Sequence, residues 1–460
     1  MVVGNVPEAA DLVVVGAGPG GYEAALHAAK LGRRVTLIDE AGEEGIGGVC
    51  LNVGCIPSKA LIELSERFHF LSEASAMGLS TAGASVDMAA FQQWKSSVVH
   101  KLSSGVSGAL AKAKVSIRKG RARLISPSSL VINDGEGGAQ FVDFKDIVLA
   151  TGSRPTALRQ LPVDGTRIVD STGALAFDVL PNSVAVVGGG YIGLELGMAL
   201  SRLGVKVSVV EASGTLIPSV DSRLIGPVSR RLKALGVDVH LNALATGADE
   251  THLTIQSSEG EKLIEAEKIV VAVGRIPNTD ELGLEDANIA VNDRGLIAVG
   301  LDRRVAKHIA AIGDITPGPA LAHKASAESF VAVDALNGKN VAFEPACIPA
   351  VVFTDPEIAT VGLTESEAKE AGYDVNVSRV PLGASGRAAT IGASLGYSQL
   401  VADKTDGTVL GVHLVGPHAS ELIAEAALAI ELGASAEDLS LTIHPHPTLS
   451  EQIAHIAAQV

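Results

Sequence analysis

The sequence predicts an α/β fold in which one strand-turn-helix unit occurs twice and a separate α+β domain follows. Three observations support this prediction. The chain has 460 residues, too many for a single hydrophobic core, and its length favours about three domains. It is 47% apolar with 50 glycines and only 3% aromatic residues, a composition typical of closely packed α/β proteins. A glycine-rich turn at Gly16 recurs later in the chain, at Gly188.

The composition excludes some classes of partner. The formal net charge of −16 rules out a general basic field for nucleic acid or for an anionic membrane surface. No apolar run approaches the roughly 20 residues that a membrane span needs. Residues 1–11 have neither the basic region nor the long apolar core of a signal peptide. We therefore expect a cytoplasmic protein with no nucleic-acid and no membrane partner.

The first strand-turn-helix unit begins with an apolar run at residues 11–15, followed by a glycine-rich turn and an alanine-rich stretch. Gly16, Gly18 and Gly21 permit the tight turn, the close approach of a pyrophosphate and the close packing of the helix. The next predicted strand ends at Asp39, and a carboxylate at this distance from the first glycine accepts from a ribose hydroxyl. The glycine pattern alone also occurs in ordinary strand-helix turns, so the prediction depends on the whole combination.

The second unit repeats this arrangement. Residues 183–187 form the predicted strand and Gly188, Gly190 and Gly193 the turn, while Glu211 is as far from Gly188 as Asp39 is from Gly16. Two copies with identical spacing predict two Rossmann-like domains and two bound dinucleotides. An acid at this position accepts from free ribose hydroxyls and would repel a 2′-phosphate, so we interpret the second dinucleotide as NAD rather than NADP.

Further apolar runs place additional elements. Residues 147–152 and 268–274 are each predicted as a buried strand entering a glycine turn. A third buried strand, from residue 309, ends in Asp314, for which a turn or helix N-cap is the simplest explanation without other context. From residue 345 onward, alternating strands and two helices indicate the separate α+β domain. We expect these strands at 350–353 and 397–402, and the helices near 421–432 and at the C-terminus.

Cys50 and Cys55 stand in the stretch GGVCLNVGCIPSK, residues 47–59. Five positions on a regular helix would not put both side chains on one face, but the glycines permit the distortion that a disulfide needs. In a reducing compartment, a close pair of this kind is more often redox-active or metal-binding than structural. A zinc site needs four ligands, and Cys347 with scattered histidines makes a poor case for completing one, so we predict no metal site.

The last chemically informative stretch, residues 442–451, reads TIHPHPTLSE. In a structural interpretation, Thr448 and Glu451 form a capping box that opens the C-terminal helix. In a functional interpretation, the Glu451 carboxylate orients a histidine and raises its basicity, which gives a base that works near neutral pH. The residues alone support these interpretations about equally.

One family resembles this chain over essentially its whole length. The resemblance rests on the cysteine stretch, the two glycine fingerprints, Ala150-Thr151-Gly152, Ile312-Gly313-Asp314 and the HPTLSE motif, in the order in which the family carries them. They are similar to the class I pyridine nucleotide-disulfide oxidoreductases, and among them to the dihydrolipoamide dehydrogenases. The cysteine motif is specific for the superfamily, whereas the final histidine motif and Glu211 point to this member.

The resemblance implies FAD and NAD as cofactors. Lys59 would lie beside the flavin and pair with Glu195, in the helix after the second fingerprint; a solvated helix lysine is the alternative. The expected FAD-binding residues are Gly16, Gly18, Gly21, Asp39, Lys59, Ala122, Thr151, Gly152, Asp314 and Ala322. The expected NAD-binding residues are Gly188, Gly190, Gly193, Glu195, Glu211 and Gly274.

The resemblance also assigns the catalytic roles. His446, oriented by Glu451, would take a proton from a dihydrolipoyl thiol; the resulting thiolate would attack Cys50, and Cys55 would face the flavin. In that family the base reaches the cysteines of the other subunit, so a homodimer is implied. The expected partners are the lipoyl domains of a 2-oxo acid dehydrogenase or glycine-cleavage complex. The expected domains are 1–150 (first part of the FAD domain), 151–276 (NAD), 277–344 (central, completing the FAD site) and 345–460 (dimerisation).

Two alternatives remain. The first is another pyridine nucleotide-disulfide reductase, for glutathione or mercuric ion; Glu211 disfavours NADP, and the mercuric enzymes' C-terminal cysteine pair is missing from the sequence. The second is a scaffold or lipoyl carrier without turnover. A carrier should present a lysine between an acid and an alanine in a turn ahead of the first fingerprint, and we find no such segment.

Overall fold

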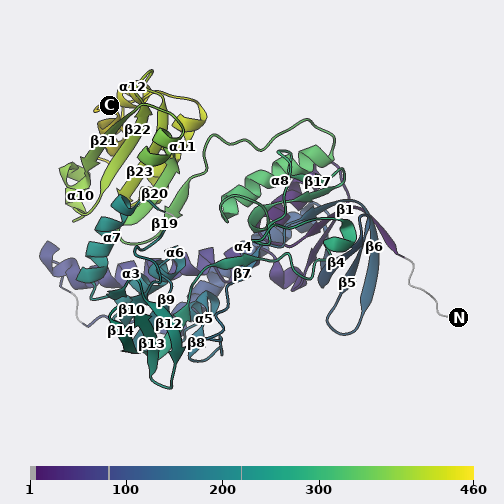
Figure 1. Ribbon diagram of the computed structural model, residues 1–460, viewed down its shortest axis with the longest axis horizontal. Coiled ribbons are helices and arrows are strands. Elements are labelled where there is room, and N and C mark those ends of the chain that lie inside the picture. Colours follow the sequence, from purple (N-terminus) through teal and green to yellow (C-terminus); the bar gives the residue numbers. More distant parts are fainter. Residues whose placement is uncertain (1–6, 81–82, 219) are drawn as a thin grey trace. The chain divides into compact units, whose positions relative to one another are not determined.

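The computed structural model describes residues 7–80, 83–218 and 220–460, and in these ranges no helix is both long and apolar enough to cross a membrane (Figure 1). The chain forms two compact units, which we treat separately. The first unit comprises Met1–Ala60, Asp87–Thr156 and Gly274–Glu344. The second comprises Leu61–Val86, Ala157–Val273 and Pro345–Val460. These units do not test the four expected domain boundaries, which stay predictions.

An eight-stranded sheet forms the centre of the first unit, with the order β17-β18-β6-β1-β2-β3 and with β4 and β5 extending from β6. The apolar run of β1 pairs in parallel with both β2 and β6, as expected for a strand buried on both faces. β18 pairs in parallel with β6, so a segment far along the chain completes the first sheet. The strands are β1 (Glu8–Val15), β2 (Val35–Asp39), β3 (Ser116–Lys119), β4 (Arg121–Ser126), β5 (Ser129–Asn133), β6 (Ala139–Leu149), β17 (Arg304–Ala306) and β18 (Ile309–Ala311).

Helices of the first unit include α1 and α8, which pack against each other. An antiparallel ribbon of β7 and β16 pairs Ser153 with Pro277 and Pro155 with Arg275. The elements are α1 (Pro19–Lys30), α2 (Gly48–Asn52), α3 (Cys55–Glu73), whose later residues belong to the second unit, α4 (Met88–Lys112), α8 (Ala322–Leu336), β7 (Ser153–Pro155) and β16 (Arg275–Pro277). Short 3-10 turns are η1 (Gly42–Gly45), η2 (Ala74–Met77, second unit), η3 (Glu285–Ala287) and η4 (Gly313–Ile315).

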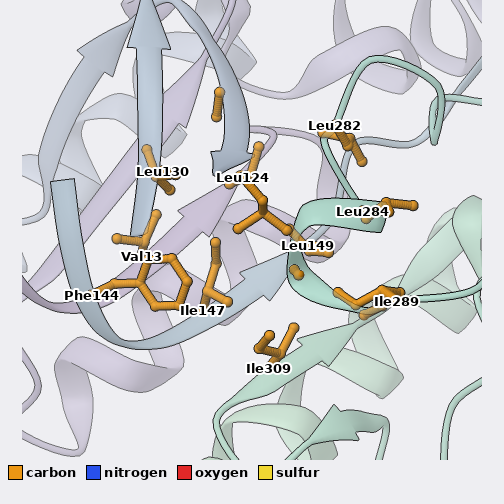
Figure 2. Packing of buried hydrophobic residues seen from close by; sticks show 14 of the residues in the cluster. Val13, Leu124, Leu130, Phe144, Ile147, Leu149, Leu282, Leu284, Ile289 and Ile309 are labelled. Carbon is orange, nitrogen blue, oxygen red and sulfur yellow. The ribbon is translucent and has the colours of Figure 1, made fainter. Parts of the chain in front are cut away.

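One face of this sheet carries an apolar core in which side chains from β1, β4, β5, β6, β18 and the segment around η3 converge (Figure 2). The core residues labelled there are Val13, Leu124, Leu130, Phe144, Ile147, Leu149, Leu282, Leu284, Ile289 and Ile309. Because the strands and the 282–289 segment share this core, the turns at the strand ends are held in fixed positions.

The second unit contains the repeated unit and the C-terminal domain. A five-stranded parallel sheet has the order β11-β10-β9-β15-β8, and a three-stranded antiparallel sheet has the order β12-β13-β14. These strands are β8 (Ile168–Val169), β9 (Ser183–Val187), β10 (Lys206–Val210), β11 (Asp238–His240), β12 (Leu244–Ala248), β13 (His252–Ser257), β14 (Gly260–Glu265) and β15 (Lys268–Val271). The helices are α5 (Ser171–Leu175), α6 (Tyr191–Arg202) and α7 (Ser222–Ala234).

The C-terminal part is an antiparallel sheet, β19-β20-β23-β22-β21, covered by helices, which confirms the α+β prediction. The predicted strands at 350–353 and 397–402 and the helix near 421–432 correspond to β19, β22 and α11. The strands are β19 (Ala350–Val352), β20 (Glu357–Gly362), β21 (Val375–Pro381), β22 (Tyr397–Asp403) and β23 (Val409–Gly416). The helices are α9 (Glu365–Glu370), η5 (Leu382–Ala384), α10 (Gly386–Thr390), α11 (Ala419–Glu431), α12 (Ala436–Leu441) and α13 (Glu451–Ala457).

Each fingerprint turn contains two kinds of glycine: one whose Cα lies too close to neighbouring backbone for a Cβ, and one with open space where a Cβ would be. A Cβ on Gly193 would lie 2.0 Å from the Gly188 carbonyl oxygen, and one on Gly21 would lie 1.8 Å from that of Gly16. A Cβ on Gly190 or Gly18 would meet no described atom within 4 Å. The first kind of glycine is therefore needed for folding, and the second kind is needed only by whatever occupies the turn.

We predict that Gly193→Ala lowers the stability of the chain by about 1–3 kcal/mol, because helix α6 must shift away from Gly188. Gly190→Ala should leave the melting temperature unchanged, because Gly190 has φ −74° and open space around the missing Cβ. Thermal unfolding followed by circular dichroism measures both. Equal melting temperatures for the two variants would contradict the distinction.

Candidate functional site

The first fingerprint turn is anchored by the acid at the end of β2. Asp39 Oδ2 accepts a hydrogen bond from Ala17 N at 2.9 Å, and Oδ1 accepts one from Ala41 N at 3.0 Å. A carboxylate has about four acceptor sites, so two backbone amides leave capacity for ribose hydroxyls. The residue that sequence analysis selected for ribose therefore also fixes the turn.

A cavity of about 510 Å³ opens beside Asp39 in the first unit. Four of the predicted FAD-binding residues lie on its wall: Gly16, Asp39, Ala122 and Thr151. Its other lining residues are Val15, Ile38, Glu40, Gly120, Arg121, Arg154, Asn278, Asp280, Glu281 and Leu282. The volume, the ribose-binding acid and the small Ala122 suit the adenosine part of FAD.

The predicted pyrophosphate position, at the N-terminus of α1, lies next to this cavity, since Gly16 belongs to both the turn and the cavity wall. Gly18 is the N-cap residue of this helix, and no described atom lies within 4 Å of the Cβ that it lacks. A helix N-terminus with open space before it favours an anion. Gly21 and Gly16 pack against each other, as predicted. The residues present thus fit the phosphates of a dinucleotide.

The cysteine stretch contacts this turn directly. Gly47 N donates to Ala17 O at 2.9 Å, and a Cβ on Gly48 would lie 2.6 Å from Gly18 Cα. Gly47 and Gly48 have φ values of +95° and +59°, conformations that favour glycine. The backbone before Cys50 can therefore approach the nucleotide turn only because glycines stand there.

The two cysteines lie on either side of a helix break. Cys50 belongs to α2, α2 ends at Asn52, and α3 begins at Cys55. This break brings together side chains that a continuous helix would separate, and both are thiols in this structure. The pKa of Cys50 is raised, first by its hydrogen bond with Cys55 and then by burial, while Lys59 acts in the opposite direction. The raised pKa favours the protonated thiol at Cys50.

Asp314 lies in the short turn η4 after β18. Its Oδ2 accepts from Ser153 Oγ at 2.5 Å, and Ser153 is itself held by Arg275. Ala322, another predicted FAD-binding residue, is the first residue of α8, and Gly152 has φ +67° in the turn before β7. Asp314 is therefore more than a turn residue: it is tied to the β7–β16 ribbon.

A buried charge cluster underlies this turn. Glu328 Oε2 accepts from Gly313 N at 2.7 Å, and Lys324 Nζ donates to Gly313 O at 3.0 Å. Glu328 Oε1 pairs with Lys324 at 3.2 Å and with Arg303 at 2.9 Å. Burial lowers the pKa of Lys324, although the charge of Glu328 opposes this effect. The peptide of Gly313 is thus held on both sides, which orients Asp314 beside it.

The second fingerprint repeats the anchoring of the first. Glu211 Oε2 accepts from Gly189 N at 2.7 Å, and Oε1 accepts from Ser213 N at 2.8 Å. Gly188 has φ +112°, and Gly190 is the N-cap residue of α6. These contacts follow those of the first turn at the same offset in sequence, so the second turn also fits a dinucleotide.

Two predicted contacts are not tested. Glu195 is buried in α6, and its Oε1 accepts from Phe353 N at 3.0 Å. Lys59 and Gly274 belong to the first unit, whereas Glu195 and the second fingerprint belong to the second. The Lys59–Glu195 pair and the contact of Gly274 with NAD remain predictions.

The geometry of the histidine motif agrees with its functional interpretation and only in part with its structural one. Glu451 Oε1 lies 2.8 Å from His446 Nδ1, and Glu451 Oε2 accepts from Thr448 N at 2.9 Å. The hydrogen bond with His446 is the largest cause of the lowered pKa of Glu451. The capping-box prediction was wrong in part, because Ser450 is the N-cap residue of α13 and the Thr448 hydroxyl donates to Pro445 O.

The two histidines of the motif differ in accessibility. The His446 side chain is 80% exposed, and with Nδ1 bound to Glu451, Nε2 remains for proton exchange. The His444 side chain is 7% exposed; its Nε2 lies 2.8 Å from Glu425 and its Nδ1 2.9 Å from Thr442 O. His446 is therefore the candidate base, and His444 fastens the loop to α11.

Several polar residues that shape this site were not predicted from the sequence. They are Ser153, Arg154, Arg275, Asn278, Arg303, Lys324 and Glu328. Only Lys324 and Glu328 carried a usable signal, since an acid and a base four positions apart share one helix face. The others meet across segments that lie far apart in the sequence.

Known proteins match the chain along its length. Residues 10–329 match the family described as Pyridine nucleotide-disulphide oxidoreductase, and residues 348–457 match the dimerisation domain of that family. The chain is 47% identical to the dihydrolipoyl dehydrogenase of Geobacillus stearothermophilus, over 100% of this chain and 98% of the relative. It is 44% identical to that of Bacillus subtilis strain 168, with the same coverage.

Solved structures agree with this similarity. LpdA from Mycobacterium tuberculosis is 28% identical, with a TM-score of 0.90 over 98% of this chain and 99% of that one. The HOCl-induced flavoprotein disulfide reductase RclA from Escherichia coli is also 28% identical, with a TM-score of 0.87 over 98% of this chain and 100% of that one. Together with the sheets described above, these matches confirm two Rossmann-like domains and a C-terminal domain.

We predict that Glu328→Gln destabilises the first unit by about 3–5 kcal/mol, because Lys324 and Arg303 would keep buried positive charge without a carboxylate. Lys339→Gln removes an exposed ion pair with Asp334 and is the matched control, with an expected cost of about 0–1 kcal/mol. Chemical denaturation monitored by fluorescence compares the variants. A cost for Glu328→Gln no larger than that of the control would contradict the role of the buried cluster.

Proposed function

This chain belongs to the pyridine nucleotide-disulphide oxidoreductase family, and from that premise we infer that it has dihydrolipoyl dehydrogenase activity. It oxidises dihydrolipoamide to lipoamide and reduces NAD to NADH, with FAD as the second cofactor. The observation that carries this conclusion is the position of the thiol pair. Gly48 packs on Gly18, so Cys50 and Cys55 lie against the turn that fits the pyrophosphate of the first dinucleotide.

Thiol exchange at Cys50 is the first chemical step. A dihydrolipoyl thiolate attacks the Cys50 sulfur of the Cys50–Cys55 disulfide, and the S–S bond breaks to leave Cys55 as a thiolate. The second lipoyl thiolate then attacks the lipoyl sulfur of the mixed disulfide, which forms the S–S bond of lipoamide and expels Cys50 as a thiolate; this thiolate takes a proton from the base that deprotonated the lipoyl thiol. The raised pKa of Cys50, caused first by its hydrogen bond with Cys55 and then by burial, supports Cys50 as the sulfur that is protonated when lipoamide leaves. FAD, when bound, supplies the two-electron carrier between this pair and NAD.

His446 is the proposed base for both lipoyl thiols, because only the thiolate is nucleophilic. Its exposed ring reaches substrate, and Glu451 fixes Nδ1 so that Nε2 takes the proton. Pro445 and Pro447 limit the loop on each side of this histidine. The chain thus holds the base by backbone restriction and by one carboxylate.

Glu211 supports the choice of NAD over NADP. Its carboxylate binds two backbone amides and keeps acceptor capacity for the ribose hydroxyls, whereas a 2′-phosphate at this position would meet a negative charge. In the first unit, Asp39 and the cavity beside it hold the adenosine of FAD, and Asp314 with Ala322 hold its ribityl chain and flavin.

The dimerisation domain at residues 348–457 supports a homodimer. We propose that His446 of one subunit serves the thiol pair of the other, and that protein-bound dihydrolipoamide arrives on the lipoyl domains of a 2-oxo acid dehydrogenase or glycine-cleavage complex. The cytoplasm is the proposed location, because in its reducing environment a close cysteine pair is more often redox-active than structural.

We predict that the purified chain carries FAD and reduces NAD with dihydrolipoamide, with a kcat/KM at least 100-fold above that for glutathione disulfide with NADPH. Initial rates of NADH formation and of NADPH consumption, followed by nicotinamide absorbance, give the comparison. A preference for glutathione disulfide and NADPH would instead favour another disulfide reductase of this family.

We predict that His446→Gln lowers kcat with dihydrolipoamide by about 100-fold to 10,000-fold, the usual contribution of a general base. The variant should keep its flavin absorbance, because His446 lies outside the FAD-binding unit. His455→Gln, four positions beyond Glu451 on α13, is the matched control and should keep wild-type turnover. Full turnover in His446→Gln would overturn the assignment of the base.

A further inference from the structure

Arg275 directly follows Gly274 and binds Ser153 with two donors. Its Nε donates to Ser153 Oγ at 2.8 Å, and its Nη2 donates to the Ser153 carbonyl oxygen. Ser153 is 5% exposed and donates to Asp314 Oδ2 at 2.5 Å. Arg275, Ser153 and Asp314 all belong to the first unit. They join three segments that lie far apart in the sequence.

The direction of these hydrogen bonds is determined by chemistry. A serine hydroxyl has one proton and two acceptor sites, and a guanidinium only donates. Since Arg275 occupies an acceptor site of Ser153 Oγ, the single hydroxyl proton is free to point at Asp314. The Asp314 carboxylate therefore receives a charge-assisted bond at Oδ2, and Oδ1 stays available for another donor.

We call the hydrogen-bonded chain of Arg275, Ser153 and Asp314 the relay. The β7–β16 ribbon, which carries Arg275 and Ser153, also borders the cavity beside Asp39. Thr151 and Asn278 exchange hydrogen bonds of 2.7 and 2.9 Å, and Arg154 donates to Asn278 Oδ1 at 2.9 Å. Thr151, Arg154 and Asn278 line the cavity. The same pair of short strands thus sets the wall on the adenosine side and, through Ser153, the position of Asp314.

We propose that Arg275 is a positioning residue for FAD, which acts through the Ser153 hydroxyl to orient the Asp314 carboxylate toward the ribityl chain. This inference rests on the assignment of Asp314 to FAD in the proposed function. Lys324 and Glu328 hold the backbone beside Asp314, and Arg275 with Ser153 hold its side chain. Loss of the relay leaves the carboxylate in place but without a fixed orientation.

The test measures release of FAD from the purified holoenzyme, followed by the rise in flavin fluorescence after dilution. Arg275→Gln and Ser153→Ala should each release FAD about tenfold faster, because each removes a bond that supports a charged group. Arg123→Gln is the matched control: Arg123 pairs with Asp286 at the surface of the same unit, and its loss should change the rate less than twofold.

A double-mutant comparison separates the relay from a general structural role. In an Asp314→Asn background, adding Arg275→Gln should change the release rate less than twofold, because the residue through which Arg275 acts has already lost its charge. The midpoint potential of the bound flavin should follow the same pattern. Should Arg275→Gln fail to accumulate with flavin, the same comparison with Ser153→Ala decides.

The outcomes are distinguishable from those of the activity assay. An increase in release of less than threefold in the background that keeps Asp314 overturns the proposal, as does an equal increase in both backgrounds. If the wild-type chain carries FAD and oxidises dihydrolipoamide, but the variants show no coupling between Arg275 and Asp314, only the proposal for Arg275 is overturned and the proposed function stands. A wild-type chain that holds no flavin would overturn the proposed function together with the relay.

Discussion

The close approach of two glycine turns is the constraint on which the site depends. Gly48 lies so near Gly18 that a single added carbon would come within 2.6 Å of the facing backbone. This approach puts the helix that carries Cys50 against the N-terminus of α1, where backbone amides favour phosphate. Redox chemistry and nucleotide binding are thereby joined through backbone contact, without any special side chain. A larger residue at Gly48 would push the helix that carries Cys50 away from this turn.

The second constraint is an acid bound to its own turn. Asp39 accepts from Ala17 N, and Glu211 accepts from Gly189 N at the equivalent place. Each carboxylate therefore has two functions: it holds the turn in shape, and it presents acceptors for a ribose. The same geometry thus occurs twice, and each copy fits a dinucleotide. The cavity lined by Ala122 makes the first turn suitable for adenosine of FAD.

Buried charge supports the turn that carries Asp314, the residue proposed for the flavin end of FAD. A glutamate with no exposed surface, Glu328, holds the Gly313 peptide and neutralises Lys324 and Arg303. Such a cluster costs desolvation and adds little stability over apolar packing, so its value lies in fixing one arrangement of the turn. Glu451 likewise fixes one arrangement of its loop: one carboxylate oxygen orients His446 and the other accepts from the Thr448 amide ahead of α13.

The sequence by itself determined the two glycine turns, the acid that follows each of them and the pairing of Cys50 with Cys55, whereas the choice of His446 with Glu451 came from the family resemblance. Each of these is local, or repeats a spacing set by one strand and one helix, and such patterns are readable along the chain. Only the tertiary structure decided that Ser153 meets Asp314, far along the chain, and that Arg303 meets Glu328. These contacts depend on which strands become neighbours in the sheet, which no local pattern specifies. The glycines of the cysteine stretch predicted a distortion between Cys50 and Cys55, and the structure shows it as the break between α2 and α3.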